Sequence, residues 1–317
     1  MVLLLAAGLV LLVVGAEGLV RGASKLALGA GLSPLVVGLT VVAFGTSAPE
    51  LAVSIGASRS GQAALALGNV VGSNVFNVLF ILGVSALVAP LVANRQLTRL
   101  DVPIGIGVSV GALLLAFDGT VSRLDGLLLV VGLVGYTALQ VLLAWAESAS
   151  ARGELSNSPD GPSVTTGAGP VPVESVAEDP PAALWQWGLN GGLVVGGLVL
   201  LVLGAEWFVE GAIEAARRLG LSELVIGLTI VAGGTSLPEF ATSILSSVRG
   251  QRDIAIGNVV GSNIFNLLGV LGFSATVSPT GIAVSGSSLW FDFPVMIAAA
   301  VACLPIFYTG HRIARWE

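Results

Sequence analysis

Two short motifs place a proline, a carboxylate and hydroxyl side chains inside apolar sequence. The first is GTSAPE, which ends at Glu50, and the second is GGTSLPE, which ends at Glu239. Proline lacks an N–H and its ring crowds the carbonyl four residues back, so Pro49 should free the carbonyl of Gly45 and loosen its neighbours. Carbonyl, hydroxyl and carboxylate oxygens gathered in one place suit hard cations such as Na⁺ and Ca²⁺.

The charge of these glutamates has no obvious partner in the sequence. Glu50 is the only charged residue between Lys25 and Arg59. A carboxylate inside a membrane span is costly unless it is paired, and it marks a functional site by default. A bound cation is therefore the expected partner of Glu50 and Glu239. The alternative is a protonated glutamate beside a helix-kinking proline, which is a weaker explanation for two copies than for one.

A second polar motif, GNVVGSNVFN, follows each proline motif. Asn69, Ser73 and Asn77 are spaced by four, so they share one face of a helix, and that face should point at the cation pocket. The second copy repeats the pattern with Asn258, Ser262 and Asn266. Hydrogen bonding between helices is the alternative role, and it competes best at Asn69 and Asn258.

Two further asparagines, Asn74 and Asn263, lie off this polar face. We expect them to hold backbone groups near the broken helices. Four other acidic residues are interpreted as having no role in cation binding at the central site. Asp101 and Asp292 begin predicted spans and should be interfacial, while the matching Glu17 and Glu206 lie near helix ends, where they snorkel or line a vestibule.

The composition excludes a soluble domain. Of the 317 residues, 55% are hydrophobic and 10% are charged, with a mean hydropathy of +0.95, whereas soluble domains carry about 25% charged residues. The chain is therefore expected to be an all-α polytopic membrane protein in contact with the lipid bilayer. No basic patch indicates a nucleic-acid partner, and no nucleophile–base pair indicates an enzyme.

Nine segments are long and apolar enough to span a bilayer, which takes roughly 20 residues. They are 2–20, 33–57, 64–90, 102–118, 124–146, 186–212, 222–247, 254–279 and 289–309. Between the fifth and the sixth lies a segment rich in Pro, Gly, Ser and acids, which predicts a solvated linker over 147–183.

The chain contains an internal duplication. Residues 35–83 and 224–272 align without gaps, share 31 of 49 residues, and place the two glutamates 189 positions apart. The first repeat, 1–146, holds five spans, and an odd number places the second repeat, 184–317, upside down in the membrane. Two inverted five-helix repeats are a transporter architecture. By this symmetry a tenth helix is expected after residue 317, and its absence is interpreted as truncation of the sequence.

The basic residues favour one orientation. With the N-terminus outside, the predicted cytoplasmic loops hold nine arginines and lysines and the outer loops hold four. Because cytoplasmic loops carry the excess of Lys and Arg, the linker is predicted to be cytoplasmic. The expected location is the plasma membrane.

The paired motifs resemble the two α-repeats of the sodium/calcium exchangers of the cation/Ca²⁺ antiporter superfamily, most of all its compact prokaryotic members. The resemblance covers nearly the whole chain. It implies a ten-helix fold, of which nine helices are evident here, and exchange of three Na⁺ for one Ca²⁺ by alternating access. It implies no cofactor, with the transported ions bound in the core, and a monomer is expected.

The resemblance also implies a set of ion ligands. Glu50 and Glu239 would bridge Ca²⁺ together with the carbonyls of Thr46 and Thr235. The flanking Na⁺ ligands and the central amides would be the Ala43 carbonyl, Ser47, Ser73, the Ala232 carbonyl, Ser236, Ser262, Asn77 and Asn266.

One position departs from the family pattern, because many members carry aspartate where this chain has Asn266. The predicted site then holds two formal negative charges, so one Ca²⁺ neutralises it and three Na⁺ leave one excess positive charge, which fits electrogenic exchange. The departure leaves the stoichiometry and K⁺ dependence open. Ca²⁺/H⁺ antiport and K⁺-dependent Na⁺/Ca²⁺ antiport are the alternatives within this class, and a Ca²⁺ channel is an alternative outside it.

Overall fold

The computed structural model describes residues 1–92, 95–156, 184–221, 232–308 and 312–313, and these are almost entirely helical. Within these ranges, seven continuous helical stretches are long and apolar enough to cross a membrane, and a bent pair of helices makes an eighth. The continuous stretches, with η denoting a π-helical segment, are α1 (Val2–Ala30), α5–η2–α6 (Ala63–Phe76, Asn77–Leu82, Gly83–Val88), η3–α7 (Leu97–Asp101, Val102–Leu115), α8 (Arg123–Ser156), α9 (Leu184–Arg218), α13–η5–α14 (Arg252–Phe265, Asn266–Leu271, Gly272–Val277) and η6–α15 (Ser288–Asp292, Phe293–Tyr308).

The predicted span 222–247 lies partly outside the described residues, which resume with α11 (Ala232–Gly234) and α12 (Leu237–Val248). The linker prediction is wrong at its start, because α8 continues to Ser156. The stretch 147–156 contains no proline, and six of its ten residues are Ala, Glu, Leu or Arg, which favour helix. The rest of the predicted linker, 157–183, lies outside the described residues.

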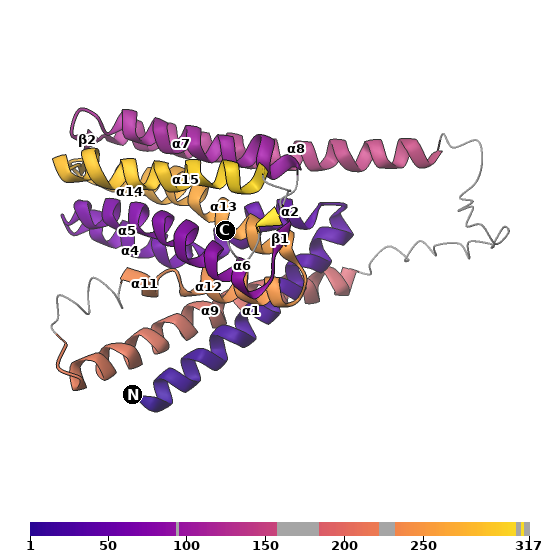
Figure 1. Ribbon diagram of the computed structural model, residues 1–317, viewed down its shortest axis with the longest axis horizontal. Coiled ribbons are helices and arrows are strands. Elements are labelled where there is room, and N and C mark those ends of the chain that lie inside the picture. Colours follow the sequence, from indigo (N-terminus) through magenta and orange to yellow (C-terminus); the bar gives the residue numbers. More distant parts are fainter. Residues whose placement is uncertain (93–94, 157–183, 222–231, 309–311, 314–317) are drawn as a thin grey trace.

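The helices α1 and α9 cross the molecule side by side, along its lower edge in Figure 1. Glycines spaced by seven line the contact, namely Gly8, Gly15 and Gly22 on α1 and Gly197, Gly204 and Gly211 on α9. A Cβ placed on Gly197 would lie 2.5 Å from the backbone nitrogen of Leu19. Residue numbers rise along α1 as they fall along α9 at these contacts, so the two helices run antiparallel. Small residues permit such close approach, which is how helices associate in lipid.

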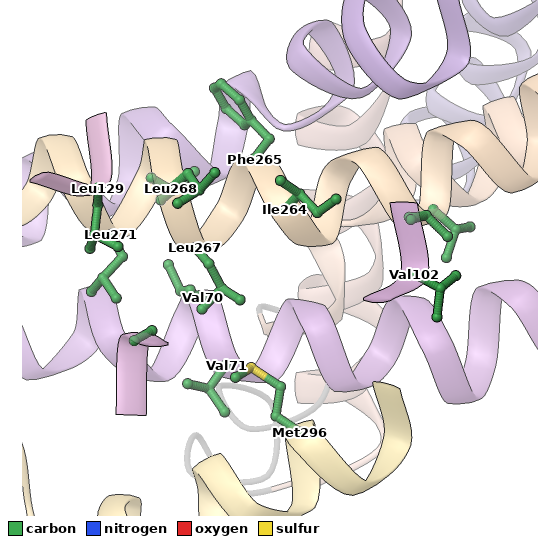
Figure 2. Close-up of a cluster of buried hydrophobic side chains, with 14 of the residues drawn as sticks. Val70, Val71, Val102, Leu129, Ile264, Phe265, Leu267, Leu268, Leu271 and Met296 are labelled. Carbon is green, nitrogen blue, oxygen red and sulfur yellow. The ribbon is translucent and has the colours of Figure 1, made fainter. Parts of the chain in front are cut away.

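The core is centred on α13 and η5, which are buried along nearly their whole length. Figure 2 shows Ile264, Phe265, Leu267, Leu268 and Leu271 from this stretch facing apolar side chains of four other helices. Those side chains are Val70 and Val71 of α5, Val102 of α7, Leu129 of α8 and Met296 of α15. The second half of the chain therefore supplies the central helix, around which three helices of the first half and α15 of the second half pack.

Two short antiparallel strand pairs join distant loops. β1 (Leu91–Val92) pairs with β4 (Arg312–Ile313), and β2 (Thr120–Val121) pairs with β3 (Ile282–Ala283). β1 precedes η3–α7 and β4 follows η6–α15, so the first strand pair joins the start of one helix to the end of the other. α7 and α15 lie side by side in Figure 1, and this pairing means that they run in opposite directions.

Candidate cation-binding site

Each proline motif interrupts a helix at its serine. α2 (Pro34–Val37), η1 (Gly38–Val42) and α3 (Ala43–Thr46) lead up to Ser47, and α4 (Ala48–Arg59) leaves it at a bend of 44°. Ser47 has φ −83° and ψ 9°, and Ser236, before α12, has φ −88° and ψ 9°. Pro49 and Pro238 occupy the first turn of α4 and α12, where a missing N–H costs no helical hydrogen bond. The same residues therefore produce the same break twice.

The two breaks meet in the centre of the molecule, and each serine reaches the glutamate of the other motif. Ser47 donates to Glu239 Oε1 at 2.9 Å, and Ser236 donates to Glu50 Oε1 at 3.1 Å. Both glutamates are fully buried. The sequence predicted that Glu50 and Glu239 share one pocket, and the structure brings both carboxylates into one reciprocal pair of hydrogen bonds.

The threonines and the first asparagine of each polar face link the same elements. Thr46 donates to Asn258 Oδ1 at 3.0 Å, and Thr235 Oγ1 lies 3.4 Å from Asn69 Oδ1. The amide nitrogens of Asn69 and Asn258 in turn donate to the backbone carbonyls of Glu50 and Glu239, each at 3.3 Å. The role of Asn69 and Asn258 is therefore hydrogen bonding between helices, which was the alternative interpretation of these two residues.

The remaining predicted ligands lie on the same faces. Ser73 Oγ is 3.3 Å from Ser236 Oγ, and Ser262 Oγ is 3.5 Å from Thr46 Oγ1. The Ala43 carbonyl accepts the Ser47 N–H at 3.1 Å, so Ser47 keeps one helical bond while Pro49 cannot donate to Gly45. Ala232 is the first residue of α11, and its side chain lies outside the described set.

Four buried oxygen atoms at the site have no hydrogen-bond partner within the described part of the chain. They are Glu50 Oε2, Glu239 Oε2, Asn77 Oδ1 and Asn266 Oδ1. A buried acceptor without a donor is costly, and a buried charge without a partner costs more. Neither glutamate forms an ion pair with any described residue. An oxygen-lined site with two unpaired carboxylates is suited to a hard cation.

The structure corrects two predictions outside the site. Asp101 is fully buried rather than interfacial, and its Oδ1 accepts hydrogen bonds from Tyr136 at 3.3 Å and from Gln140. The partners lie on α8, so no feature near Asp101 in the sequence identifies them. Asn74 and Asn263 do hold backbone groups, but these belong to α13 and α5 rather than to the broken helices, because each asparagine donates to the backbone carbonyl of the other.

Glu17 is a partly buried acid with two ion-pair partners. It forms ion pairs with Arg21 on its own helix and with Arg249 at the end of α12. Its counterpart Glu206 is exposed. The two copies of this acid therefore differ in their surroundings although their sequences match.

Comparison with known proteins shows to which family the chain belongs. The model of the family described as sodium/calcium exchanger protein matches residues 1–142 and 189–317. The sodium/calcium exchanger MaX1 of Methanosarcina acetivorans is 35% identical over 332 residues, covering 99% of this chain and 93% of MaX1. The inner membrane protein YrbG of Escherichia coli is 38% identical over 304 residues, covering 94% of this chain and 86% of YrbG.

The fold matches a solved structure over the same extent. A structure of the sodium-calcium exchanger NCX_Mj superposes with a TM-score of 0.78 at 28% identity, covering 99% of this chain and 92% of NCX_Mj. The family match spans most of both halves of the chain, and both proline motifs lie within it. The chain belongs to the sodium/calcium exchanger family.

Proposed function

We propose that this protein is a secondary antiporter that exchanges Na⁺ for Ca²⁺ across the membrane by alternating access. The observation that carries the proposal is the reciprocal pairing of Ser47 with Glu239 and of Ser236 with Glu50. It places two carboxylates from two broken helices in one buried site, where each retains an unpartnered oxygen. The negative charge of the two carboxylates has to be balanced by bound cations, which suits a carrier that binds one kind of cation and then another.

The proposed ligands follow from this geometry. Glu50 and Glu239 bridge Ca²⁺ with the carbonyls of Thr46 and Thr235. Two formal charges are balanced by one Ca²⁺, whereas three Na⁺ exceed them by one, so exchange of three Na⁺ for one Ca²⁺ would move net charge. The Na⁺ ligands on either side are the Ala43 and Ala232 carbonyls and the side chains of Ser47, Ser73, Ser236 and Ser262, while Asn77 and Asn266 complete the centre.

An inverted duplication supports a carrier over a channel. In the duplication, β1 of the first half corresponds to β3 of the second half, and β2 corresponds to β4. Each strand pairs with the counterpart of the other strand, so that β1 pairs with β4 and β2 pairs with β3. α7 therefore runs opposite to its counterpart α15, and α1 runs opposite to its counterpart α9. Two halves of opposite orientation around one site can exchange conformations, and so open the site to each side in turn.

The distribution of basic residues bears on the location and orientation of the protein. We place the protein in the plasma membrane with its N-terminus outside and residues 157–183 in the cytoplasm, on the distribution of basic residues. Impermeant maleimide applied to whole cells would then label Val2→Cys but not Ser158→Cys, both in a Cys303→Ser background. The reverse pattern would contradict this orientation.

The deciding experiment is uptake of ⁴⁵Ca²⁺ into proteoliposomes loaded with Na⁺ and diluted into Na⁺-free medium. Exchange predicts uptake that requires internal Na⁺. If three Na⁺ leave for each Ca²⁺ that enters, one net positive charge leaves per cycle, so an inside-positive potential set with valinomycin and a K⁺ gradient should stimulate uptake and an inside-negative potential should slow it. Uptake that ignores the Na⁺ gradient would indicate a channel, and uptake driven by a pH gradient would indicate Ca²⁺/H⁺ antiport. A requirement for external K⁺, on the side from which Ca²⁺ enters, would indicate the K⁺-dependent exchanger.

A further inference from the structure

Four asparagines form a crossed cluster where α5 meets α13. Asn74 Nδ2 donates to the backbone carbonyl of Asn263 at 3.1 Å, and Asn263 Nδ2 lies 3.4 Å from the backbone carbonyl of Asn74. Asn266 Nδ2 donates to Asn74 Oδ1 at 3.1 Å, and Asn77 Nδ2 donates to Asn263 Oδ1 at 3.0 Å. Each asparagine of the cluster thus contacts the opposite repeat. Nothing in the proposed transport site requires Asn74 or Asn263 as a ligand.

The two backbone carbonyls determine how every amide in the cluster is turned. A carbonyl only accepts hydrogen bonds, so the nitrogens of Asn74 and Asn263 must face it. Asn74 also has its nitrogen 3.7 Å from the sulfur of Met296, another acceptor. The oxygens of Asn74 and Asn263 must then face Asn266 and Asn77. Two amide oxygens in contact would repel, so Asn266 and Asn77 have to present their nitrogens to the cluster.

This arrangement leaves one defined atom of each ligand asparagine free. Asn77 Oδ1 and Asn266 Oδ1 are buried and have no partner among the described residues. Asn77 lies one turn beyond Ser73, which contacts Ser236, and Asn266 lies one turn beyond Ser262, which contacts Thr46. Both asparagines are the first residue of a π-helical segment, a feature that recurs at functional sites.

We infer that Asn74 and Asn263 are positioning residues that fix the amide orientation of Asn266 and Asn77, so that these two amides present oxygen rather than nitrogen to the transported cation. An amide turned the other way would point its NH₂ group, with its partial positive charge, at the ion. The inference rests on the proposed function, because it concerns the ligands of that site. It assigns each positioning residue to one ligand of the opposite repeat.

The test uses double-mutant cycles of alanine variants at all four positions in the full-length protein. The readout is the unfolding temperature in detergent as a function of Ca²⁺ and, separately, of Na⁺ concentration, which reports ion binding without requiring transport. Uptake of ⁴⁵Ca²⁺ by the same variants then separates the half-saturating Ca²⁺ concentration from the maximal rate.

We expect Asn74→Ala to raise the half-saturating concentration of Ca²⁺ by about fivefold to tenfold, as for loss of one oriented ligand. In an Asn266→Ala background Asn74→Ala should add little, since the amide that it orients is gone. In an Asn77→Ala background it should keep most of its effect. Asn263→Ala should show the mirror pattern, coupled to Asn77 and nearly independent of Asn266.

A purely structural role makes a different prediction. Loss of the bond to the opposite backbone would then lower the ion-free unfolding temperature by the same amount in every background and leave the ion dependence unchanged, and that outcome would overturn the inference. If Asn74→Ala does not fold, Asn74→Ser and the mirror pair of Asn263 and Asn77 carry the same test.

Failure of the inference is distinguishable from failure of the proposed function. Ion binding with additive cycles would overturn the inference and leave Na⁺/Ca²⁺ exchange standing. Coupled cycles in the binding assay, together with ⁴⁵Ca²⁺ uptake that ignores Na⁺, would overturn the exchange mechanism and support the positioning role. A wild-type protein stabilised by neither ion would overturn both.

Discussion

Glu17 of α1 and Arg249, the residue after α12, form an ion pair of 2.8 Å that ties the α1–α9 helix pair to the helix carrying Glu239. Ser24 and Gln251 form a hydrogen bond one to two turns further along α1. Both contacts lie away from the glycine-lined interface that α1 shares with α9. α1 is thus attached both to its counterpart helix and to the broken helix of the opposite repeat.

The first prediction concerns this ion pair. The side chains of Glu17 and Arg249 are 21% and 50% exposed, so solvent screens them and the pair should contribute at most about 1 kcal/mol to stability. Glu17→Gln should lower the unfolding temperature slightly in low-salt detergent and not in concentrated choline chloride. Glu206→Gln, at the matching exposed position, is the control and should change nothing. Equal effects of both variants at both salt concentrations would contradict an electrostatic contribution.

The second prediction concerns the serines at the two breaks. Ser47→Ala removes the donor to Glu239, and Ser236→Ala removes the donor to Glu50. Hydrogen bonds to charged groups contribute about 1.5–3 kcal/mol, so each change should weaken Na⁺ and Ca²⁺ binding at least about tenfold.

The controls for these serines are Ser58→Ala and Ser246→Ala. Both serines are fully buried on the same helices, α4 and α12, and their hydroxyls have no partner within the described ranges. We expect ion-dependent thermal stabilisation to be unchanged in the controls. Weakened binding in the controls as well would show that helix packing, rather than the contact with the carboxylate, is responsible.

The third prediction concerns the carboxylates themselves. Glu50→Gln and Glu239→Gln each remove a buried charge and leave the size of the side chain unchanged. Each variant should therefore fold, and in the absence of ions it should unfold at the same temperature as the wild type or at a higher one. The Ca²⁺-dependent rise in unfolding temperature and the uptake of ⁴⁵Ca²⁺ should both be lost. Uptake retained by both variants would refute the site.

The fourth prediction concerns the contact between α1 and α9. A Cβ on Gly197 would lie 2.5 Å from Leu19 N, whereas one on the neighbouring Gly196 meets no described atom within 4 Å. Gly197→Ala should therefore force the helices apart and destabilise the protein by roughly 1–3 kcal/mol. Gly196→Ala should be neutral or slightly stabilising, since alanine favours helix. Unfolding by heat or by denaturing detergent compares the two variants.

The fifth prediction concerns Asp101, which is buried and accepts from Tyr136 and Gln140. Asp101→Asn keeps an oxygen for both donors and removes a buried charge, so its stability should equal or exceed that of the wild type. Asp101→Ala leaves the two donors without their acceptor and should cost about 1–3 kcal/mol. If the asparagine variant is as unstable as the alanine variant, the charge itself stabilises the fold.

The sequence contained enough to predict the breaks and the chemistry of the site. Pro49 and Pro238 act on their own helices through a missing N–H, and the spacing of Asn69, Ser73 and Asn77 follows from helical period alone. Repetition of both motifs then predicted that Glu50 and Glu239 would lie together. These are local rules applied twice, so the helical fold class and the polar residues of the site followed from residue order, while the assignment of individual ion ligands came from the family resemblance.

Only the tertiary structure decided which groups meet. Ser47 binds the glutamate of the opposite motif rather than Glu50, Asn74 reaches the backbone of Asn263, and Asp101 is enclosed by residues of α8. The rotation and tilt of each helix determine such contacts, and they depend on packing across the whole bundle, including glycine contacts such as that of Gly197 with Leu19. The sequence by itself therefore determined where the chain breaks and which oxygens it offers. The packing of the helices decided which partner each oxygen takes, because partners 35 to 192 residues apart leave no trace in local periodicity.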